Sequence, residues 1–335
     1  MSKTVLVIGG GSVGKRHARN LAAEGCQIAL MEPREDRRAE LAAEIQLVGN
    51  HATLETAIGA RRYDGAVIAS PPSFHVVQGR ACLAAGLPLF LEKPVSPRLA
   101  DAQALKQAAA ASGTPLLLGY TWRWWPPFES VRRHLTAETI GVLRHVKFIL
   151  AAHLADWHPY ERYQDFFMAS TALGGGALLD ESHWIDLLLW FFGQPRDVMA
   201  RVEKISGLDI DTDDNVDMLI GYESGLRVSM HLDLYGRPHE KFVQFSGEKG
   251  TMRWSEAPNE VATWTTDSSA WARETFDCQR NDMFVAAIRE YLSLLSGRTY
   301  PLTCTLDDGI AVLRVIEAAR LSHAEGRRIA LKDIG

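Results

Sequence analysis

The 335-residue sequence contains few cysteines, no long apolar run and no cluster of basic residues, and each absence excludes a class of protein. The four cysteines lie far apart and form no CxxC pair, which argues against a zinc ribbon, a dithiol redox site and a disulfide framework. No apolar stretch approaches the ~20 residues that span a bilayer. No Lys/Arg run indicates a nucleic-acid or membrane surface, and the first residues lead into an expected strand without the pattern of a signal peptide. We therefore expect a cytoplasmic protein that binds neither nucleic acid nor membrane.

Short apolar runs alternate with amphipathic segments in the first third of the chain, which is typical of a parallel sheet. We expect strands at 4–8, 27–31, 65–69, 88–91 and 115–119, with a further short strand at 45–48. Helices are expected at 14–24, 34–44, 74–85 and 97–112. This order predicts an N-terminal Rossmann domain, a doubly wound parallel sheet, over residues 1–120.

The pattern changes after Tyr120, and residues 121–335 predict a second domain of the α+β class. A long alternating strand is expected at 142–154, and an apolar helix from the glycine run 174–176 to Phe192. Strands with turn signals follow from 196 to about 266 and predict a large, open, mainly antiparallel sheet. Helices at 281–295 and 306–325 close the chain. The last one, with Thr305 as its N-cap, is expected to pack back toward the first domain.

The segment VLVIGGGSVGKRH places Gly9, Gly11 and Gly14 in a GxGxxG arrangement between an expected strand and an expected helix. The first glycine permits a tight turn, the second lets backbone N–H groups approach a pyrophosphate, and the third lets the helix pack closely on the strand. The helix N-terminus favours the phosphate charge. The motif predicts a dinucleotide site; a glycine turn in an α/β protein without nucleotide is the alternative.

Glu32 stands at the end of the second expected strand, where a carboxylate accepts hydrogen bonds from the adenosine ribose hydroxyls. Its position favours NAD over NADP. Arg34 and Arg37 follow closely, and a guanidinium is able to pair with a 2′-phosphate, so NADP stays open as the alternative cofactor.

Three further motifs carry a family resemblance. ASPPSFH occupies Ala69–His75, LEKP occupies Leu91–Pro94, and GGGALLDESHWIDLLLWFFG occupies Gly174–Gly193. Together with the N-terminal glycines and the last helix, they resemble the Gfo/Idh/MocA oxidoreductases, the glucose-fructose oxidoreductase and inositol dehydrogenase family. The resemblance covers nearly the whole chain.

By this resemblance, Lys93 corresponds to the catalytic lysine of the EKP motif. Its peptide bond to Pro94 is expected to be cis, which turns the lysine toward the nicotinamide. Asp180 and His183 correspond to the pair on the first helix of the substrate domain. They are three residues apart (DxxH), whereas most relatives have DxxxH; both spacings put the two side chains on one helical face.

The expected binding residues form two sets. The first set is expected to contact the cofactor: Gly9, Gly11, Ser12, Val13, Gly14, Glu32, Arg34, Ser70, Pro71, His75, Glu92 and Lys93. The second is expected to contact the substrate: Trp122, Arg123, Trp125, His158 and Tyr163. The alternative for Trp122 and Trp125 is a place in the hydrophobic core without substrate contact. The alternative for Arg123 is an ion pair with a carboxylate. No spacing matches a metal site; the aspartate-rich run 209–217 lacks the calcium-loop pattern and is expected to be a turn.

Oxidation of a secondary alcohol removes the hydroxyl proton as hydride leaves the same carbon. An imidazole with a pKa of ~6.5 suits that proton transfer, an ammonium stabilises charge on the oxygen, and a carboxylate orients the imidazole. We therefore assign His183 as general acid/base, Lys93 as the group that polarises the oxygen and is able to transfer a proton, and Asp180 as orienter or substrate ligand. Glu181 or Asp186 is a further candidate to share this last role with Asp180.

The sequence thus predicts an NAD(P)-dependent dehydrogenase acting on the CH–OH group of a sugar, a sugar derivative or a cyclic polyol. The resemblance implies a homodimer or homotetramer formed through the C-terminal sheet. One alternative is an enzyme that recycles a tightly bound NAD(H) during epimerisation, oxidoreduction or glycoside cleavage. A non-catalytic NAD(P)-binding regulator is the other, and such a protein does not need Lys93 and His183 together.

Overall fold

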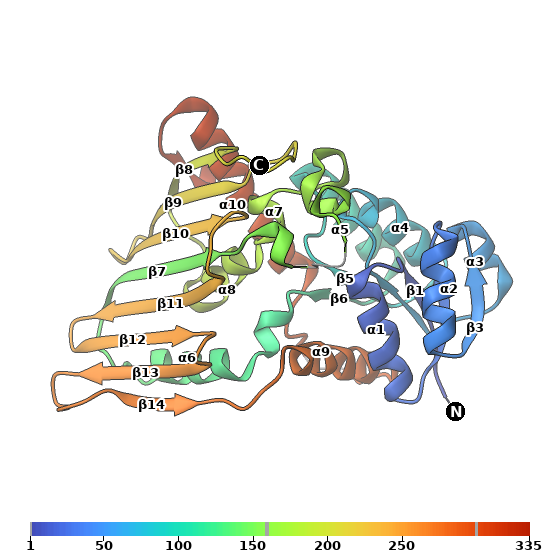
Figure 1. The fold of residues 1–335 in the computed structure, drawn as a ribbon, viewed down its shortest axis with the longest axis horizontal. Coiled ribbons are helices and arrows are strands. Elements are labelled where there is room, and N and C mark those ends of the chain that lie inside the picture. The colour runs from blue at the N-terminus through green and yellow to red at the C-terminus, as the bar shows by residue number, and fades with distance from the viewer. Residues whose placement is uncertain (1, 158–160, 299–300) are drawn as a thin grey trace. The chain divides into compact units, whose positions relative to one another are not determined.

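The structure is a computed structural model that describes residues 2–157, 161–298 and 301–335 (Figure 1). The chain forms two compact units. The first consists of the residues up to Thr121 together with Arg280–Ile310, and the second of Trp122–Gln279 together with Ala311–Gly335. The sequence-based division placed 280–310 in the second domain, whereas in the structure this segment belongs to the first unit.

The first unit is built on a six-stranded sheet with the order β3-β2-β1-β4-β5-β6, in which every pair of neighbours is parallel. Its strands are β1 (Thr4–Ile8), β2 (Gln27–Met31), β3 (Leu47–His51), β4 (Gly65–Ile68), β5 (Leu89–Glu92) and β6 (Leu116–Gly119). The central strands are continuous apolar runs, as parallel strands covered on both faces require. This confirms the predicted Rossmann sheet.

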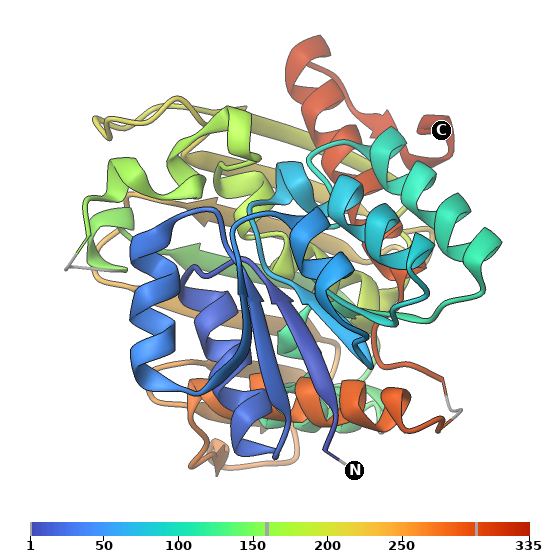
Figure 2. The ribbon, with the colours of Figure 1, turned by 90° about the vertical axis from the view of Figure 1, so that its right-hand side faces the viewer.

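Helices connect and cover these strands (Figure 2). They are α1 (Ser12–Ala23), α2 (Glu35–Glu44), α3 (Leu54–Ala60), α4 (Pro72–Ala84), α5 (Leu99–Ser112) and α9 (Arg280–Leu295). α1 packs against α9, and α4 against α5. Tyr291 explains why α9 joins this unit: its hydroxyl is buried 3.0 Å from the carbonyl oxygen of Ala66 and 2.8 Å from that of Pro88.

The second unit carries a nine-stranded sheet with the order β14-β13-β12-β11-β7-β10-β9-β8-β15 (Figure 1). Its strands are β7 (Leu143–Ala151), β8 (Asp197–Glu203), β9 (Asn215–Gly221), β10 (Arg227–Asp233), β11 (Glu240–Gly247), β12 (Gly250–Ser255), β13 (Glu260–Thr265), β14 (Ala272–Thr275) and β15 (Ile329–Ala330). β7 and β10 are parallel, and the other neighbouring pairs are antiparallel. This confirms the predicted open, mainly antiparallel sheet.

Aromatic side chains join one face of this sheet to the helices α6 (Pro126–Thr136) and α8 (His183–Phe192). Trp184 on α8 lies 6.0 Å from Trp254 on β12 and 6.1 Å from Phe148 on β7, measured between ring centroids.

The final helix, α10 (Leu306–Glu325), begins as predicted. The Thr305 hydroxyl accepts from the Asp308 N–H at 3.2 Å, and the Asp308 carboxylate accepts from the Thr305 N–H at 2.7 Å.

The single apolar helix predicted from the glycine run to Phe192 is wrong. The segment forms α7 (Ala177–Asp180) and then α8, so Asp180 ends one helix and His183 begins the next. Between them the backbone tightens to i→i+3 bonds, from Ser182 N–H to the Leu179 carbonyl and from Trp184 N–H to the Glu181 carbonyl. Apolar periodicity does not reveal this change, because both helices bury apolar residues at the junction.

None of the helices in the described part of the chain combines the length and the apolar character that a membrane crossing requires.

Candidate active site

The glycine loop between β1 and α1 has the geometry that its motif predicts. Gly9 has φ +99°, and a Cβ there would lie 2.7 Å from the carbonyl oxygen of Ala69. A Cβ on Gly14 would collide with the carbonyl oxygen of Gly9. A Cβ on Gly11, in contrast, would make only an ordinary van der Waals contact, 3.9 Å from the guanidinium of Arg37. The loop therefore leaves room beside the N-terminus of α1, where four backbone N–H groups have no partner within the helix.

Glu32, the residue after β2, lies next to this loop. Its carboxylate accepts hydrogen bonds from the backbone N–H groups of Gly10 at 2.7 Å and Arg34 at 2.9 Å. Each oxygen retains a lone pair for a hydroxyl group. The Arg34 guanidinium pairs with the exposed Asp36, and that hydrogen bond lowers the pKa of Asp36 to about 2. Arg37, rather than Arg34, thus has its guanidinium beside the glycine loop.

Two more predicted segments lie at the carboxyl edge of the same parallel sheet. Ser70 and Pro71 follow β4, and Lys93 follows β5. The peptide bond between Lys93 and Pro94 is cis, as expected. Because the carboxyl ends of neighbouring parallel strands share one edge, this edge carries the glycine loop, the Ser70 segment and the lysine.

His75 on α4 bridges the last two of these segments. It is fully buried, with Nδ1 2.8 Å from the carbonyl oxygen of Pro94 and Nε2 2.8 Å from that of Ser70. Burial disfavours the imidazolium and lowers the pKa of His75. Glu92 is also buried, and its carboxylate lies 2.6 Å from Nε2 of His17. Contact of either side chain with the cofactor stays a prediction.

In the second unit, Asp180 and Glu181 are buried and His183 is half-buried. Asp186, one of the alternatives for the role of Asp180, forms a buried ion pair with Arg123. Nε of the guanidinium is 2.9 Å from Oδ2, and Nη2 is 2.7 Å from Oδ1. The pairing with a carboxylate, left open for Arg123 by the sequence, is therefore present.

The other predicted substrate residues have mixed surroundings. Trp122 and Trp125 are buried, with their ring centroids 5.8 Å apart, and Trp122 also packs on Trp254 at 5.6 Å. The half-buried Tyr163 accepts a hydrogen bond from the N–H of Asp209 at 3.2 Å. His158 lies outside the described residues. Contact of these side chains with a substrate stays a prediction.

The aspartate run before β9 was expected to be a turn. The sequence did not indicate that it also holds the segment from Thr171 to Leu178, which leads to Asp180. Asp213 accepts a hydrogen bond from the N–H of Leu178 in the first turn of α7 at 2.8 Å, and Asp211 accepts one from Thr171 at 2.7 Å. Burial raises the pKa of Asp213, against the opposing effect of the Leu178 N–H. The only available signal was the density of aspartates, which does not identify partners about 35–40 residues away.

Two family descriptions match the chain. Residues 3–120 match the oxidoreductase family with an NAD-binding Rossmann fold, and residues 128–253 match the Gfo/Idh/MocA C-terminal domain.

Individual proteins are similar over most of the chain. The D-apiose dehydrogenase of Paraburkholderia graminis is 25% identical over 294 residues, which are 83% of this chain and 75% of that protein. The inositol 2-dehydrogenase of Leifsonia xyli is 24% identical, over 86% of this chain and 85% of its own. The crystal structure of GenD2 from gentamicin A biosynthesis, in complex with NAD, has a TM-score of 0.83 and 25% identity, and the match covers 98% of this chain and 96% of that chain. With its glycine loop, its Lys93–Pro94 segment and both domain matches, the chain belongs to the Gfo/Idh/MocA family of NAD-binding oxidoreductases.

Proposed function

We propose that this protein is a dehydrogenase that transfers a hydride between NAD and the secondary CH–OH group of a sugar, a sugar derivative or a cyclic polyol. The observation that carries the proposal is the position of Lys93, directly after β5 and at the same sheet edge as the glycine loop. The similar proteins named for D-apiose and inositol support this substrate class.

The residues of the first unit fit a dinucleotide. The room beside Gly11 and the N–H groups at the start of α1 that have no partner within the helix suit a pyrophosphate. The Glu32 carboxylate suits the adenosine ribose hydroxyls. When bound, NAD supplies the hydride acceptor or donor. The protein then has to position the substrate and move one proton.

Three side chains divide this work. His183 takes the hydroxyl proton during oxidation and returns it during reduction, a role that contributes about 10²–10⁴-fold in rate. The Lys93 ammonium holds the substrate oxygen and stabilises negative charge on it. Asp180, at the end of α7, orients the imidazole or binds a neighbouring hydroxyl.

Replacement of Lys93 and His183 by alanine tests these roles. Each variant is assayed at 340 nm with NAD or NADH and a panel of sugars and inositols, and NADH affinity is measured by fluorescence titration. We expect kcat/KM to fall at least about 100-fold in both variants, while the NADH Kd changes less than about threefold. Lys106→Ala, which removes a surface lysine paired with Asp307, is the control and is expected to retain activity. Wild-type turnover in either catalytic variant excludes the assigned role.

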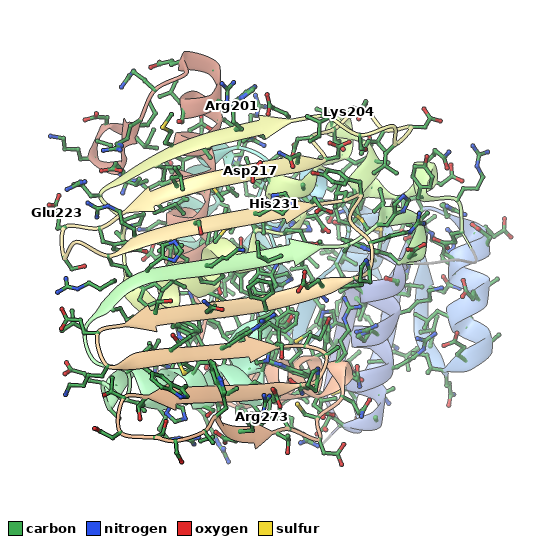
Figure 3. All side chains as sticks on the ribbon, turned by 60° about the vertical axis from the view of Figure 1, so that its left-hand side comes forward. Arg201, Lys204, Asp217, Glu223, His231 and Arg273 are labelled. Atoms are coloured by element: carbon green, nitrogen blue, oxygen red, sulfur yellow. The ribbon has the colours of Figure 1, made fainter. Side chains whose placement is uncertain are left out.

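We also propose a homodimer or homotetramer formed through the nine-stranded sheet. Figure 3 shows the sheet face that bears Arg201, Asp217 and His231. Met199 and Leu219 are paired in register on this face and are 45% and 62% exposed. We place these two neighbouring apolar side chains at the centre of the proposed interface.

Sedimentation analysis tests the assembly. We expect Leu219→Glu to lower the average mass at a given protein concentration, because it places a charge in the proposed interface. Val77→Glu is the matched control, since Val77 on α4 is 67% exposed and lies outside this sheet. A monomeric wild-type protein, or equal masses for wild type and Leu219→Glu, excludes this interface.

A further inference from the structure

Two buried histidines hold the residues on either side of Lys93. His17 on α1 lies with Nε2 2.6 Å from the Glu92 carboxylate, and His75 on α4 lies with Nδ1 2.8 Å from the Pro94 carbonyl oxygen. Both imidazoles are completely inaccessible to solvent. The proposed mechanism uses neither of them.

The surroundings of His17 define how it bonds to Glu92. Its ring meets the rings of Phe90 and Phe284 edge-on, with centroids 4.9 Å and 5.7 Å away. Nδ1 is buried without a hydrogen-bond partner among the described residues. A proton on Nδ1 would be an unsatisfied buried donor, so the ring proton belongs on Nε2, where it is donated to Glu92. In this apolar enclosure the bond is stronger than in water.

Glu92 connects His17 to the backbone of Lys93. Its second carboxylate oxygen accepts the backbone N–H of Lys93 at 3.3 Å. On its other side lies Gly119 at the end of β6, where even a Cβ would come within 3.2 Å of the carboxyl carbon. The carboxylate is therefore held between His17, the Lys93 backbone and β6.

His17 belongs to the helix that begins at the glycine loop. α1 starts at Ser12 and is fixed against β1 by the close approach of Gly14 to Gly9. One rigid element thus presents amides toward the pyrophosphate position at its start and an imidazole toward Glu92 one turn later.

We propose that His17 is a positioning residue for Lys93, which it orients through Glu92 relative to the nucleotide at the start of α1. This inference rests on the proposed function, in which Lys93 holds the substrate oxygen. His17 itself contacts neither substrate nor cofactor. His75 holds the opposite flank through Pro94, so the lysine backbone is held from two helices.

The kinetic test compares His17→Phe, which fills the aromatic enclosure without a donor, with His17→Gln, which keeps one. We expect His17→Phe and Glu92→Gln each to lower kcat about tenfold or more, and His17→Phe to keep the NADH Kd within about threefold of wild type. His17→Gln is expected to recover most of the loss. The double variant His17→Phe/Glu92→Gln is expected to lose no more than either single variant, because the two residues act as a unit.

Asn20→Ala is the matched control. Asn20 lies on the same helix, is also buried, and pairs with Asn281 through amide contacts of 3.0 Å and 3.2 Å. We expect this variant to lower the thermal midpoint without changing kcat. Equal losses of kcat in Asn20→Ala and His17→Phe, or additive losses in the double variant, overturn the proposal.

A second readout does not depend on turnover. Brief acetylation followed by mass spectrometry gives the reactivity of the Lys93 amine relative to Lys106, with and without NADH. We expect His17→Phe and Glu92→Gln to change this ratio about threefold or more, and His17→Gln and Asn20→Ala to leave it unchanged. Unchanged ratios in His17→Phe and Glu92→Gln overturn the positioning role.

If the wild-type protein oxidises no sugar or polyol, the proposed function fails, and the acetylation ratio still decides the role of His17. Should His17→Phe not fold, Glu92→Gln and His17→Gln carry the comparison.

Discussion

The guanidinium of Arg123 and the carboxylate of Asp186 form a two-point ion pair that is almost completely buried, with side-chain exposures of 4% and 0%. Asp186 lies on α8, three residues after His183, so this pair fixes the helix that begins with the proposed general base.

Removal of one partner leaves the other as an uncompensated buried charge. We expect Arg123→Ala to lower the free energy of unfolding by about 3–5 kcal/mol, measured by denaturant titration. The double variant Arg123→Leu/Asp186→Leu is expected to recover part of this loss, since apolar residues carry no desolvation cost for charge. A substrate-binding role for Arg123 alone predicts a raised KM with unchanged stability instead.

Asp213 stabilises the start of α7 from a distant loop. Asp213→Ala removes the acceptor for the Leu178 N–H and is expected to cost about 1 kcal/mol of unfolding free energy. Asp213→Asn keeps an acceptor and removes a carboxylate whose pKa is raised by burial, so we expect stability close to wild type at neutral pH. Similar stabilities for Asp213→Ala and Asp213→Asn contradict a role for the acceptor.

Gly176→Ala tests the same contact from the glycine that precedes α7. Gly176 has φ +104°, and its added Cβ would collide with the Asp213 carboxylate, so this variant is expected to lose about 1–3 kcal/mol of unfolding free energy.

Local patterns sufficed for most of the fold. The strands β1, β2, β4, β5 and β6 lie within about one residue of their predicted bounds, because each is a mainly apolar run between turn residues. β3, predicted at 45–48, begins at Leu47 and ends at His51, because its last three residues, Gly-Asn-His, carry no apolar signal. The helix Leu306–Glu325 and its Thr305 cap were also predictable, since a capping residue and a long helical period occur together. α3 was missed because its seven residues bury only Ala57 completely, which is too little for a periodic signal.

The glycine loop and Lys93 were identifiable from sequence because each belongs to a contiguous motif, and Glu32 because it stands at the end of the second expected strand. The partners that hold the site are distant in sequence: 63 residues separate Arg123 from Asp186, and 75 separate His17 from Glu92. Such pairs depend on the tertiary fold, and no local spacing encodes them. The same holds for Trp122, whose surroundings in the aromatic core depend on Trp184 and Trp254.

Cofactor preference is expected to depend on Glu32. A carboxylate at this position accepts hydrogen bonds from the ribose hydroxyls of NAD and repels the 2′-phosphate of NADP. We expect Glu32→Ala to raise the NADH Kd about tenfold and to lower the NADPH Kd, both measured by fluorescence titration. Addition of Arg37→Ala is expected to abolish the gain for NADPH, because Arg37 has its guanidinium beside the glycine loop.

Glu35→Ala is the control for net charge, since Glu35 is an exposed residue in the first turn of α2. It is expected to leave both affinities within about twofold of wild type. An equal effect of Glu35→Ala and Glu32→Ala indicates a general charge effect in place of direct recognition.

His231 on β10 lies between two carboxylates on the sheet face in Figure 3. Nδ1 is 2.8 Å from Asp217, and Nε2 is 3.1 Å from Asp233. The hydrogen bond to Asp233 raises the pKa of His231, partial burial opposes this effect, and Asp217 raises the pKa further. Asp217 lies on β9, and Arg201 of the next strand, β8, is its partner in the backbone register.

A raised pKa in the folded state gives His231 a stabilising effect that is complete below the unfolded value of about 6.5 and is lost as the pH rises through the folded value. We expect His231→Asn to lower the free energy of unfolding by no more than about 1 kcal/mol at a pH of about 5.5, because partial exposure screens the charges. Near a pH of about 9 the difference is expected to vanish. His75 affects the pH dependence of stability in the opposite direction. Its pKa is lowered in the folded state, so the free energy of unfolding decreases as the pH falls below the pKa of His75 in the unfolded state. Wild type and variant share that contribution, and their difference at each pH, at equal protein concentration, isolates His231. If the loss of unfolding free energy in His231→Asn is constant with pH, or grows toward high pH, the ion pairs between the imidazolium and the two aspartates are contradicted. Both contacts are then hydrogen bonds of the neutral imidazole.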